Sequence, residues 1–169
     1  MDYDELFNKL KVDLKIAAQE YQKLLSVTIV FESKNFKLSK IYNARFYKQN
    51  FLHLTGVKTN LSTGEYFKRC LDESISKENI LNFPDAYRST IYKKVKNLKT
   101  IFSFFTCELL VQENFTRNTV TCVIATSDGY KTLGFVNTKP YIRPMTLMSR
   151  NLLDNNKKVL QITPIIKNN

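Results

Sequence analysis

The amino-acid sequence predicts an α+β protein. Apolar residues recur at helical spacing near the N-terminus, and the last third consists of short β-type runs separated by turn residues. The 169 residues, 43% of them hydrophobic, suit one sizeable core rather than two. Helices that precede a group of strands are the pattern of an α+β fold.

We expect a single domain over residues 1–169, with three parts along the chain. These are an N-terminal helix at 1–25, a mixture of helices and short strands at 26–100, and an antiparallel β-meander at 101–166. The N-terminal helix is predicted because apolar side chains recur every three or four residues. They are Leu6, Leu10, Leu14, Ala17, Tyr21 and Leu24.

The middle part begins with strands. The β-branched run SVTIVFES predicts one strand, and one or two short strands are expected next, at Ile41–Tyr47 and Phe51–Leu54, closed by Gly56. Helices follow, at NLSTGEYFKRCLDES and, more briefly, at SKENIL before Pro84. The run DAYRSTIYKKVKNLKTIFSFF predicts a longer helix, or a helix that runs into a strand near Leu98.

The last part has the texture of an antiparallel meander. Short β-type runs are FFTCELLVQ, TVTCVIATS, KTLGFVN, YIRPMTLM and KVLQITPII. The pair Asp128-Gly129 lies between two of them and is a strong signal for a tight turn. Short strands joined by such turns are typical of a meander.

The charge of the chain favours an anionic partner. With 26 Lys+Arg against 15 Asp+Glu, the net charge is +11. A field of this size suits nucleic acid, nucleotides, acidic protein surfaces or an anionic membrane. The other explanation is the lysine-rich codon usage of an AT-rich genome, with which the excess of lysine over arginine is consistent.

Acidic residues are absent from two long windows. Residues 33–64 hold six bases and no acid, and this window includes the single histidine, His53; residues 86–107 hold five bases and no acid. In the first window the lysine and arginine residues alternate with aromatic residues, which are Phe36, Tyr42, Phe46, Tyr47 and Phe51. Either these rings stack on the bases of single-stranded nucleic acid, or they face the core of a half-buried strand.

Several classes of enzyme are excluded by missing motifs. There is no GxxxxGKS/T or GxGxxG loop, no clustering of acids for two metal ions, and no set of Cys and His that could bind zinc. The N-terminus does not resemble a signal peptide, and no apolar stretch approaches ~20 residues, so we expect a cytoplasmic protein that does not enter a membrane.

One chemistry fits the residues that remain: RNA cleavage by the substrate's own 2′-hydroxyl. This reaction needs a base, an acid and groups that stabilise a pentacoordinate phosphate, but neither a metal ion nor a cofactor. A histidine can act as the base or the acid, and Arg, Lys, Tyr and Thr can hold the phosphate. The cationic window around His53 supplies these residue types.

The segments NFLHLTGV, YFKRCL, GYKTLGF and YIRPMTL together resemble phage-associated BECR-type nuclease domains. The acronym covers Barnase, EndoU, the tRNase colicins and RelE-like toxins, and the closest likeness is to an HLTG-containing subfamily of Firmicute phages and plasmids. The resemblance spans roughly residues 30–150. It implies N-terminal helices packed on a curved antiparallel sheet, and a metal-independent ribonuclease or toxin whose active site lies on the concave face.

The resemblance also implies site residues. The HLTG motif places His53 as acid or base and Thr55 as a contact to phosphate or the 2′-hydroxyl, and the YIRPMT motif adds Tyr141 and Thr146, with Pro144 shaping the strand. Charge adds Arg45 to this catalytic set. The RNA-binding residues we expect are Lys48, Lys58, Tyr130, Arg143 and Arg150.

The sequence leaves three functions open. The first is a ribonuclease of mobile-element origin that acts on cellular RNA such as tRNA or mRNA, with an immunity protein as a further partner. The second is a non-catalytic protein on the same scaffold, a phage-encoded inhibitor that binds nucleic acid or a protein of a host defence complex. It stays open because the sequence shows no strongly placed acid-base partner for His53. The third is a structural domain whose basic surface reflects genome composition.

Overall fold

The first helix, α1 (Tyr3–Gln22), begins at a capping box formed by Asp2 and Glu5. The Asp2 side chain accepts a hydrogen bond from the Glu5 N–H at 2.8 Å, and the Glu5 carboxylate accepts one from the Asp2 N–H at 3.2 Å. Two N–H groups that the helix itself cannot pair are thereby satisfied. Its buried face is largely the predicted one: Phe7, Leu10, Leu14, Ala17, Ala18 and Tyr21.

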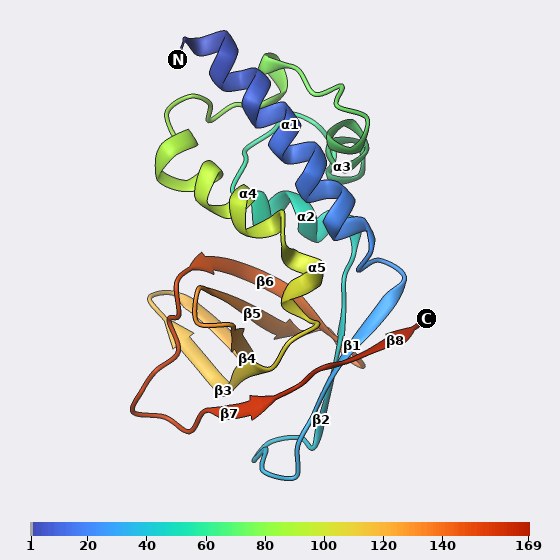
Figure 1. The fold of residues 1–169 in the computed structure, drawn as a ribbon, viewed down its shortest axis with the longest axis vertical. Coiled ribbons are helices and arrows are strands. Elements are labelled where there is room, and N and C mark those ends of the chain that lie inside the picture. Colours follow the sequence, from blue (N-terminus) through green and yellow to red (C-terminus); the bar gives the residue numbers. More distant parts are fainter. Residues whose placement is uncertain (1) are drawn as a thin grey trace.

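The computed structural model describes residues 2–169, in which a group of helices lies on one curled sheet (Figure 1). The remaining helical segments are α2 (Lys48–Thr55), α3 (Thr63–Leu71), the short 3-10 turn η1 (Lys77–Asn79), the π-helical turn η2 (Tyr87–Ile91), α4 (Tyr92–Leu98) and α5 (Ile101–Phe104). The strands are β1 (Val27–Glu32), β2 (Ile41–Arg45), β3 (Leu109–Arg117), β4 (Val120–Ser127), β5 (Lys131–Asn137), β6 (Ile142–Ser149), β7 (Leu160–Ile162) and β8 (Ile165–Asn168).

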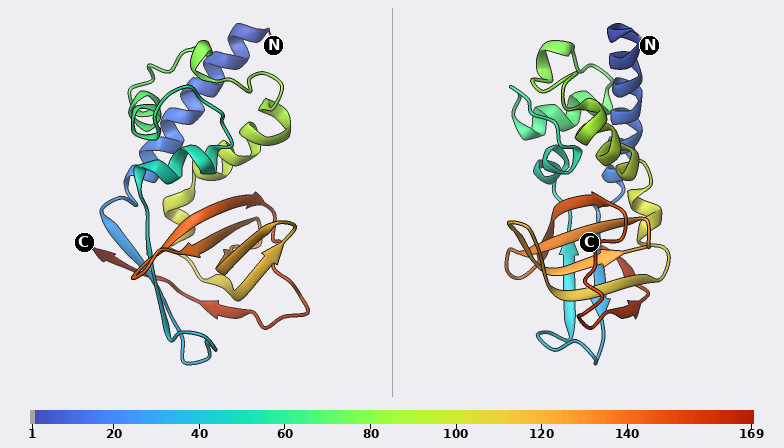
Figure 2. Two further views of the ribbon diagram at one scale, coloured as in Figure 1. Left: turned by 180° about the vertical axis from the view of Figure 1, so that it is seen from behind. Right: turned by 90° about the vertical axis from the view of Figure 1, so that its left-hand side faces the viewer.

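The sheet has the strand order β7-β3-β4-β5-β6-β2-β1-β8. Strands β3 to β6 form the predicted antiparallel meander, and the parallel contact between Ala44 of β2 and Ile142 of β6 joins the β1–β2 hairpin to it. The sheet curls so strongly that β1 and β2 run across the direction of the meander strands (Figure 2). The predicted α+β class, with N-terminal helices on a curved and mostly antiparallel sheet, is confirmed.

The predicted strand at Phe51–Leu54 is wrong, because these residues belong to the helix α2. The buried residues of α2 are Asn50, Phe51, Leu54 and Thr55, a spacing that places them on one face of a helix. A run of six residues such as FLHLTG shows too few periods to separate a helix from a strand by pattern alone.

The structure also decides the secondary structure of two other segments. The run at residues 85–105 forms the helical segments η2, α4 and α5, with a turn at residues 99–100, and no strand begins near Leu98. The predicted last strand is divided at Pro164 into β7, which pairs with β3, and β8, which pairs with β1. The chain therefore ends at the opposite edge of the sheet from β7.

Gly134 marks a crowded place in the sheet. A Cβ atom on Gly134 would lie 2.5 Å from Cys122 Sγ and 3.0 Å from Thr146 Cγ2, so the neighbouring strands approach each other where a side chain is missing. Gly64 is a matched contrast, because a Cβ atom added there in α3 would meet nothing within 4 Å.

We predict opposite effects of alanine at these two glycines. Gly134→Ala should destabilise the fold by about 1–3 kcal/mol through overpacking. Gly64→Ala should stabilise it by up to about 1 kcal/mol through helix propensity. Urea denaturation of the two variants and the parent measures both, and a neutral Gly134→Ala would contradict the packing described here.

Candidate functional site

His53 lies in the last turn of α2, where its side chain is exposed. The helix ends at Gly56, which has a φ of 72° and donates its N–H to the His53 carbonyl at 3.4 Å. A left-handed residue after the last turn is the usual way for a helix to end, and glycine adopts that conformation without steric cost. The letters HLTG are therefore the C-terminus of a helix.

Gly56 also lets Lys94 of α4 approach the end of α2. A Cβ atom on Gly56 would lie 3.0 Å from Lys94 Cδ and 2.8 Å from Thr90 Cγ2. A side chain at position 56 would thus collide with α4 as well as strain the backbone. The missing side chain brings a lysine beside the helix turn that carries His53.

The strand β6 supplies the other wall of the site through a β-bulge. Phe135 of β5 pairs with Pro144 and Gly134 pairs with Thr146, so Met145 is the extra residue. A bulge leaves its extra residue outside the regular ladder. The His53 imidazole lies against the Met145 backbone, and this polar contact favours the protonated ring.

The pKa of His53 is lowered from its ordinary value near 6.5. Partial burial is the largest cause, and the positive charges of Lys94 and Arg143 add to it, while the polar contact with Met145 opposes it. Burial also lowers the pKa of the Lys94 ammonium. At neutral pH the imidazole is therefore neutral and able to accept a proton.

Arg45 and Tyr141 come together as the sequence analysis grouped them. The Arg45 guanidinium lies over the Tyr141 ring, with 3.9 Å between Cζ and the ring centroid. Arg45 Nε also donates to Thr28 Oγ1 at 3.3 Å. Tyr141 directly precedes β6 and lies two residues from Arg143 in extended backbone, so the two side chains share one face. The stacked Arg45 therefore lies on the same face as Arg143, which is close to His53.

A groove of about 490 Å³ continues the site beyond Lys94. It runs between the turn η2, the start of α4 and the end of β6, and α4 is held to β6 by a hydrogen bond from Asn97 Nδ2 to Ser149 Oγ at 3.0 Å. Its lining consists of Ser89, Thr90, Lys93, Lys94, Leu147, Met148, Ser149 and Arg150. Cations and hydroxyls without a carboxylate suit a phosphate backbone.

Thr55 occupies the interior. Its side chain is 0% exposed, and its hydroxyl donates to the Leu52 carbonyl at 2.7 Å and accepts hydrogen bonds from Val57 N–H and Tyr66 Oη. In this structure it shapes the end of α2 and does not face a substrate.

Thr146 lies on the sheet face opposite to its neighbour Leu147, which belongs to the main core. Its methyl group faces Gly134 and Cys122. Pro144 is buried at the bulge. The structure thus places Pro144 next to the bulge residue Met145, and it packs the Thr146 methyl group toward Gly134 of β5.

The predicted RNA-binding residues fall into two groups. Arg143 is close to His53, and Arg150 lines the groove beside Tyr130, whose carbonyl accepts the Arg150 N–H and whose ring is 84% exposed. Lys48 lies at the opposite end of α2 from His53, and the exposed Lys58 follows Gly56, with its N–H bound to the Asn82 side chain. The structure records no contact that joins these two lysines to His53.

The aromatic residues of the first basic window face the core. Phe36, Tyr42, Phe46 and Phe51 are each at most 8% exposed. Stacking of nucleic-acid bases on these four rings is therefore excluded in this structure, and the second of the two explanations given for their alternation with lysines is correct. Tyr47, the fifth ring, is half-buried.

Lys94 is the candidate site residue that the sequence analysis missed. It was one base among five in an acid-free window, and no spacing in the sequence connects it with His53. The nearest signal is the glycine of HLTG, because a glycine can mark a close approach of another segment as well as a turn.

Among residues 2–169, no three His, Cys, Asp or Glu side chains gather in a way that could hold a metal ion. Within the same range, none of the helices has the length and apolar character needed to cross a bilayer.

The fold and the site define a class of protein: an α+β domain in which one histidine on a short helix meets a bulged strand and two cations. Residues 13–169 match the family described as phage-Barnase-EndoU-ColicinE5/D-RelE like nuclease4 (PBECR4), and the chain belongs to this family. The predicted resemblance to phage BECR-type nucleases is confirmed, whereas the HLTG subfamily of Firmicute phages and plasmids stays a prediction. Searches of curated proteins and of solved structures gave no significant match.

We predict that Lys94→Met raises the pKa of His53 toward 6.5, because it removes a neighbouring positive charge. A pH titration of the imidazole followed by NMR measures this, since the chain has one histidine. Lys96→Met is the matched control, because Lys96 is an exposed lysine of the same helix that does not contribute to the shift at His53. An unchanged or lower pKa in Lys94→Met would contradict the proximity of the two side chains.

Proposed function

We propose that this PBECR4 nuclease is a metal-independent endoribonuclease of phage or mobile-element origin that cleaves RNA through the 2′-hydroxyl. The observation that carries the proposal is a partly exposed histidine beside a cationic groove, whose pKa is lowered by partial burial and, to a smaller extent, by two neighbouring cations. A neutral imidazole can remove the proton of the 2′-hydroxyl, and the surrounding cations match the charge that develops on the phosphate.

The residues divide the reaction between them. His53 takes the proton as the 2′-oxygen forms a bond to phosphorus, and Arg143 stabilises the pentacoordinate phosphate. As the bond from phosphorus to the 5′-oxygen breaks, Lys94 gives a proton to the leaving oxygen, a role that suits an ammonium whose pKa is lowered. The products are a 2′,3′-cyclic phosphate and a 5′-hydroxyl end.

Arg45 and the groove serve the binding of RNA in this proposal. Stacking on Tyr141 and the bond to Thr28 hold the guanidinium in one orientation, from which it can form two hydrogen bonds to a phosphate. The flanking phosphates lie along the groove toward Arg150, with the exposed Tyr130 ring beside it as a stacking surface. Cellular RNAs such as tRNA and mRNA are the substrates, within the cytoplasm.

Purified protein incubated with labelled RNA in EDTA should yield 2′,3′-cyclic phosphate ends, and His53→Ala should lower the rate by about 10²–10⁴-fold, the range for a lost acid or base. Gln49→Ala, an exposed change in the first turn of the same helix, should leave the rate unchanged. Replacing the attacking 2′-hydroxyl of the substrate by hydrogen should abolish cleavage.

Salt-sensitive RNA binding without cleavage would overturn the catalytic proposal. It would support the alternative, a non-catalytic inhibitor that binds nucleic acid or a protein of a host defence complex.

The pH dependence of cleavage follows from the direction of the shift at His53. A base must be unprotonated, so the acid limb of kcat/KM should be centred below pH 6.5, the ordinary pKa of a histidine. Initial rates in EDTA between pH 4 and pH 8 provide the measurement. An acid limb centred at or above pH 6.5 would be inconsistent with His53 as the base.

A further inference from the structure

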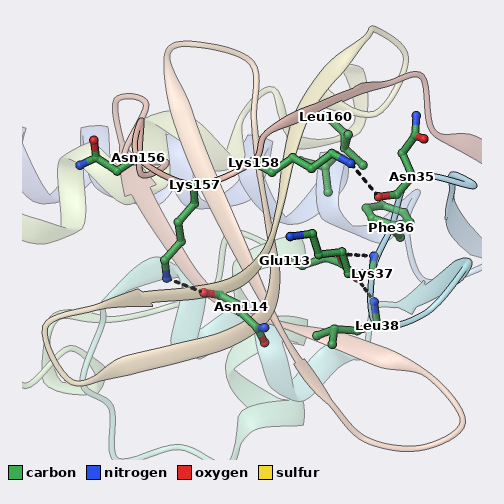
Figure 3. Close-up of a pocket in the computed structure, with 11 residues that line it drawn as sticks. Asn35, Phe36, Lys37, Leu38, Glu113, Asn114, Asn156, Lys157, Lys158 and Leu160 are labelled. Carbon is green, nitrogen blue, oxygen red and sulfur yellow. Dashed lines mark hydrogen bonds between the residues drawn. The ribbon is translucent and has the colours of Figure 1, made fainter.

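A second pocket, of about 430 Å³, lies beside the loop between β1 and β2 (Figure 3), and Figure 1 shows this loop at the end of the sheet farthest from the helices. Three segments distant in the sequence form it: the loop between β1 and β2, the middle of β3, and the segment that leads into β7. Its volume is in the range of sites that bind small molecules, which is about 300–1,000 Å³.

The carboxylate of Glu113 holds the first wall in place. It accepts hydrogen bonds from Tyr42 Oη at 2.6 Å, from the Lys37 N–H at 2.7 Å and from the Leu38 N–H at 3.0 Å. Burial pushes the pKa of Glu113 up, but these bonds outweigh it and hold the pKa below its usual range. The loop is thus tied to β3, and Leu38 is kept at the mouth although it is 61% exposed.

Two consecutive lysines tie the third wall to the other two. Lys157 Nζ donates to the Asn114 carbonyl at 3.2 Å, and Lys158 Nζ donates to the Asn35 carbonyl at 3.2 Å (Figure 3). Each ammonium has three N–H groups, so each keeps donors for a ligand. The pocket is therefore formed before any ligand binds, which lowers the entropy that binding costs.

The lining has three kinds of group. Positive charge comes from Lys37, Lys157 and Lys158, against one carboxylate whose oxygens are already bonded. Carboxamides come from Asn35, Asn114 and Asn156, and apolar surface comes from Phe36, Leu38, Val111 and Leu160. Ammonium groups bind phosphate, carboxamides can pair with the edge of a base, and aliphatic side chains pack on its face.

We propose that this pocket binds one nucleotide, with its phosphate on the lysines and its base against Leu38 and the carboxamides. The nucleotide comes either as a free ribonucleoside monophosphate or as one unit of an RNA strand. The proposal does not depend on catalysis at His53, because the two sites are built from different side chains. Tyr42 of β2 binds Glu113 in the wall of the pocket, whereas Arg45, three residues on, lies on the other face of the same strand.

Titration of the full chain with the four 5′-monophosphates, followed by NMR, tests the proposal. We expect saturable shifts of the methyl groups of Leu38 and Val111 by at least one monophosphate, and weaker binding of the matching nucleoside and of inorganic phosphate. The double variant Lys157→Gln, Lys158→Gln should weaken binding roughly tenfold or more, which corresponds to about 1.4 kcal/mol. Lys68→Gln, which removes one positive charge at an exposed position of α3, is the control and should change nothing.

A 2′-O-methyl oligonucleotide, which resists 2′-hydroxyl chemistry, distinguishes the two sources. If it shifts the same methyl groups and the free monophosphates do not, the nucleotide is a unit of RNA. The proposal is overturned if no probe binds at these methyl groups, if the double variant binds as tightly as the parent, or if inorganic phosphate binds as tightly as the best nucleotide. His53→Ala should bind normally here, so a loss of nuclease activity and a loss of this site are told apart.

Discussion

The approach of α2 to the bulged strand β6, which brings His53 against the Met145 backbone, is the contact on which the rest of the site depends. It exists because β6 carries one residue more than β5 at Gly134–Phe135, which takes Met145 out of the ladder. Pro144, which has no N–H to give to a ladder, is a natural neighbour for such a break. The segments HLTG and YIRPMT, which are far apart in the sequence, are brought together by this contact between His53 and Met145.

The site brings three cationic or ionisable groups together near the end of α2: the His53 imidazole, the Lys94 ammonium and the Arg143 guanidinium. The last carbonyls of a helix carry partial negative charge, so a cation beside them is stabilised. Lys94 packs at this end, against Gly56, and the same carbonyls lie beneath the turn that carries His53. Burial at this place nevertheless lowers the pKa of the Lys94 ammonium, so it gives up its proton more readily than an exposed lysine.

The sequence allowed the fold class, the α1 face and the meander to be predicted, because each shows several periods of its pattern. It misplaced Phe51–Leu54, where the pattern is too short, and it could not anticipate that β7 and β8 would join opposite edges of the sheet. Of the residues of the candidate site, His53 and Tyr141 could be predicted from the short sequence motifs HLTG and YIRPMT. The position of Lys94 depends on how α4 packs against Gly56, which is a tertiary contact without a local signature.

The burial of Thr55 shows why a motif can matter without touching a substrate. Its hydroxyl bonds to the Leu52 carbonyl, to the Val57 N–H and to Tyr66, so it secures the turn between His53 and the next segment. A buried network of this kind limits how far the helix end can move. In HLTG, the histidine then faces solvent, the leucine and threonine anchor the turn in the core, and the glycine admits Lys94. All four residues of HLTG thus contribute to one arrangement, in which the His53 imidazole lies between a bulged strand and two cations.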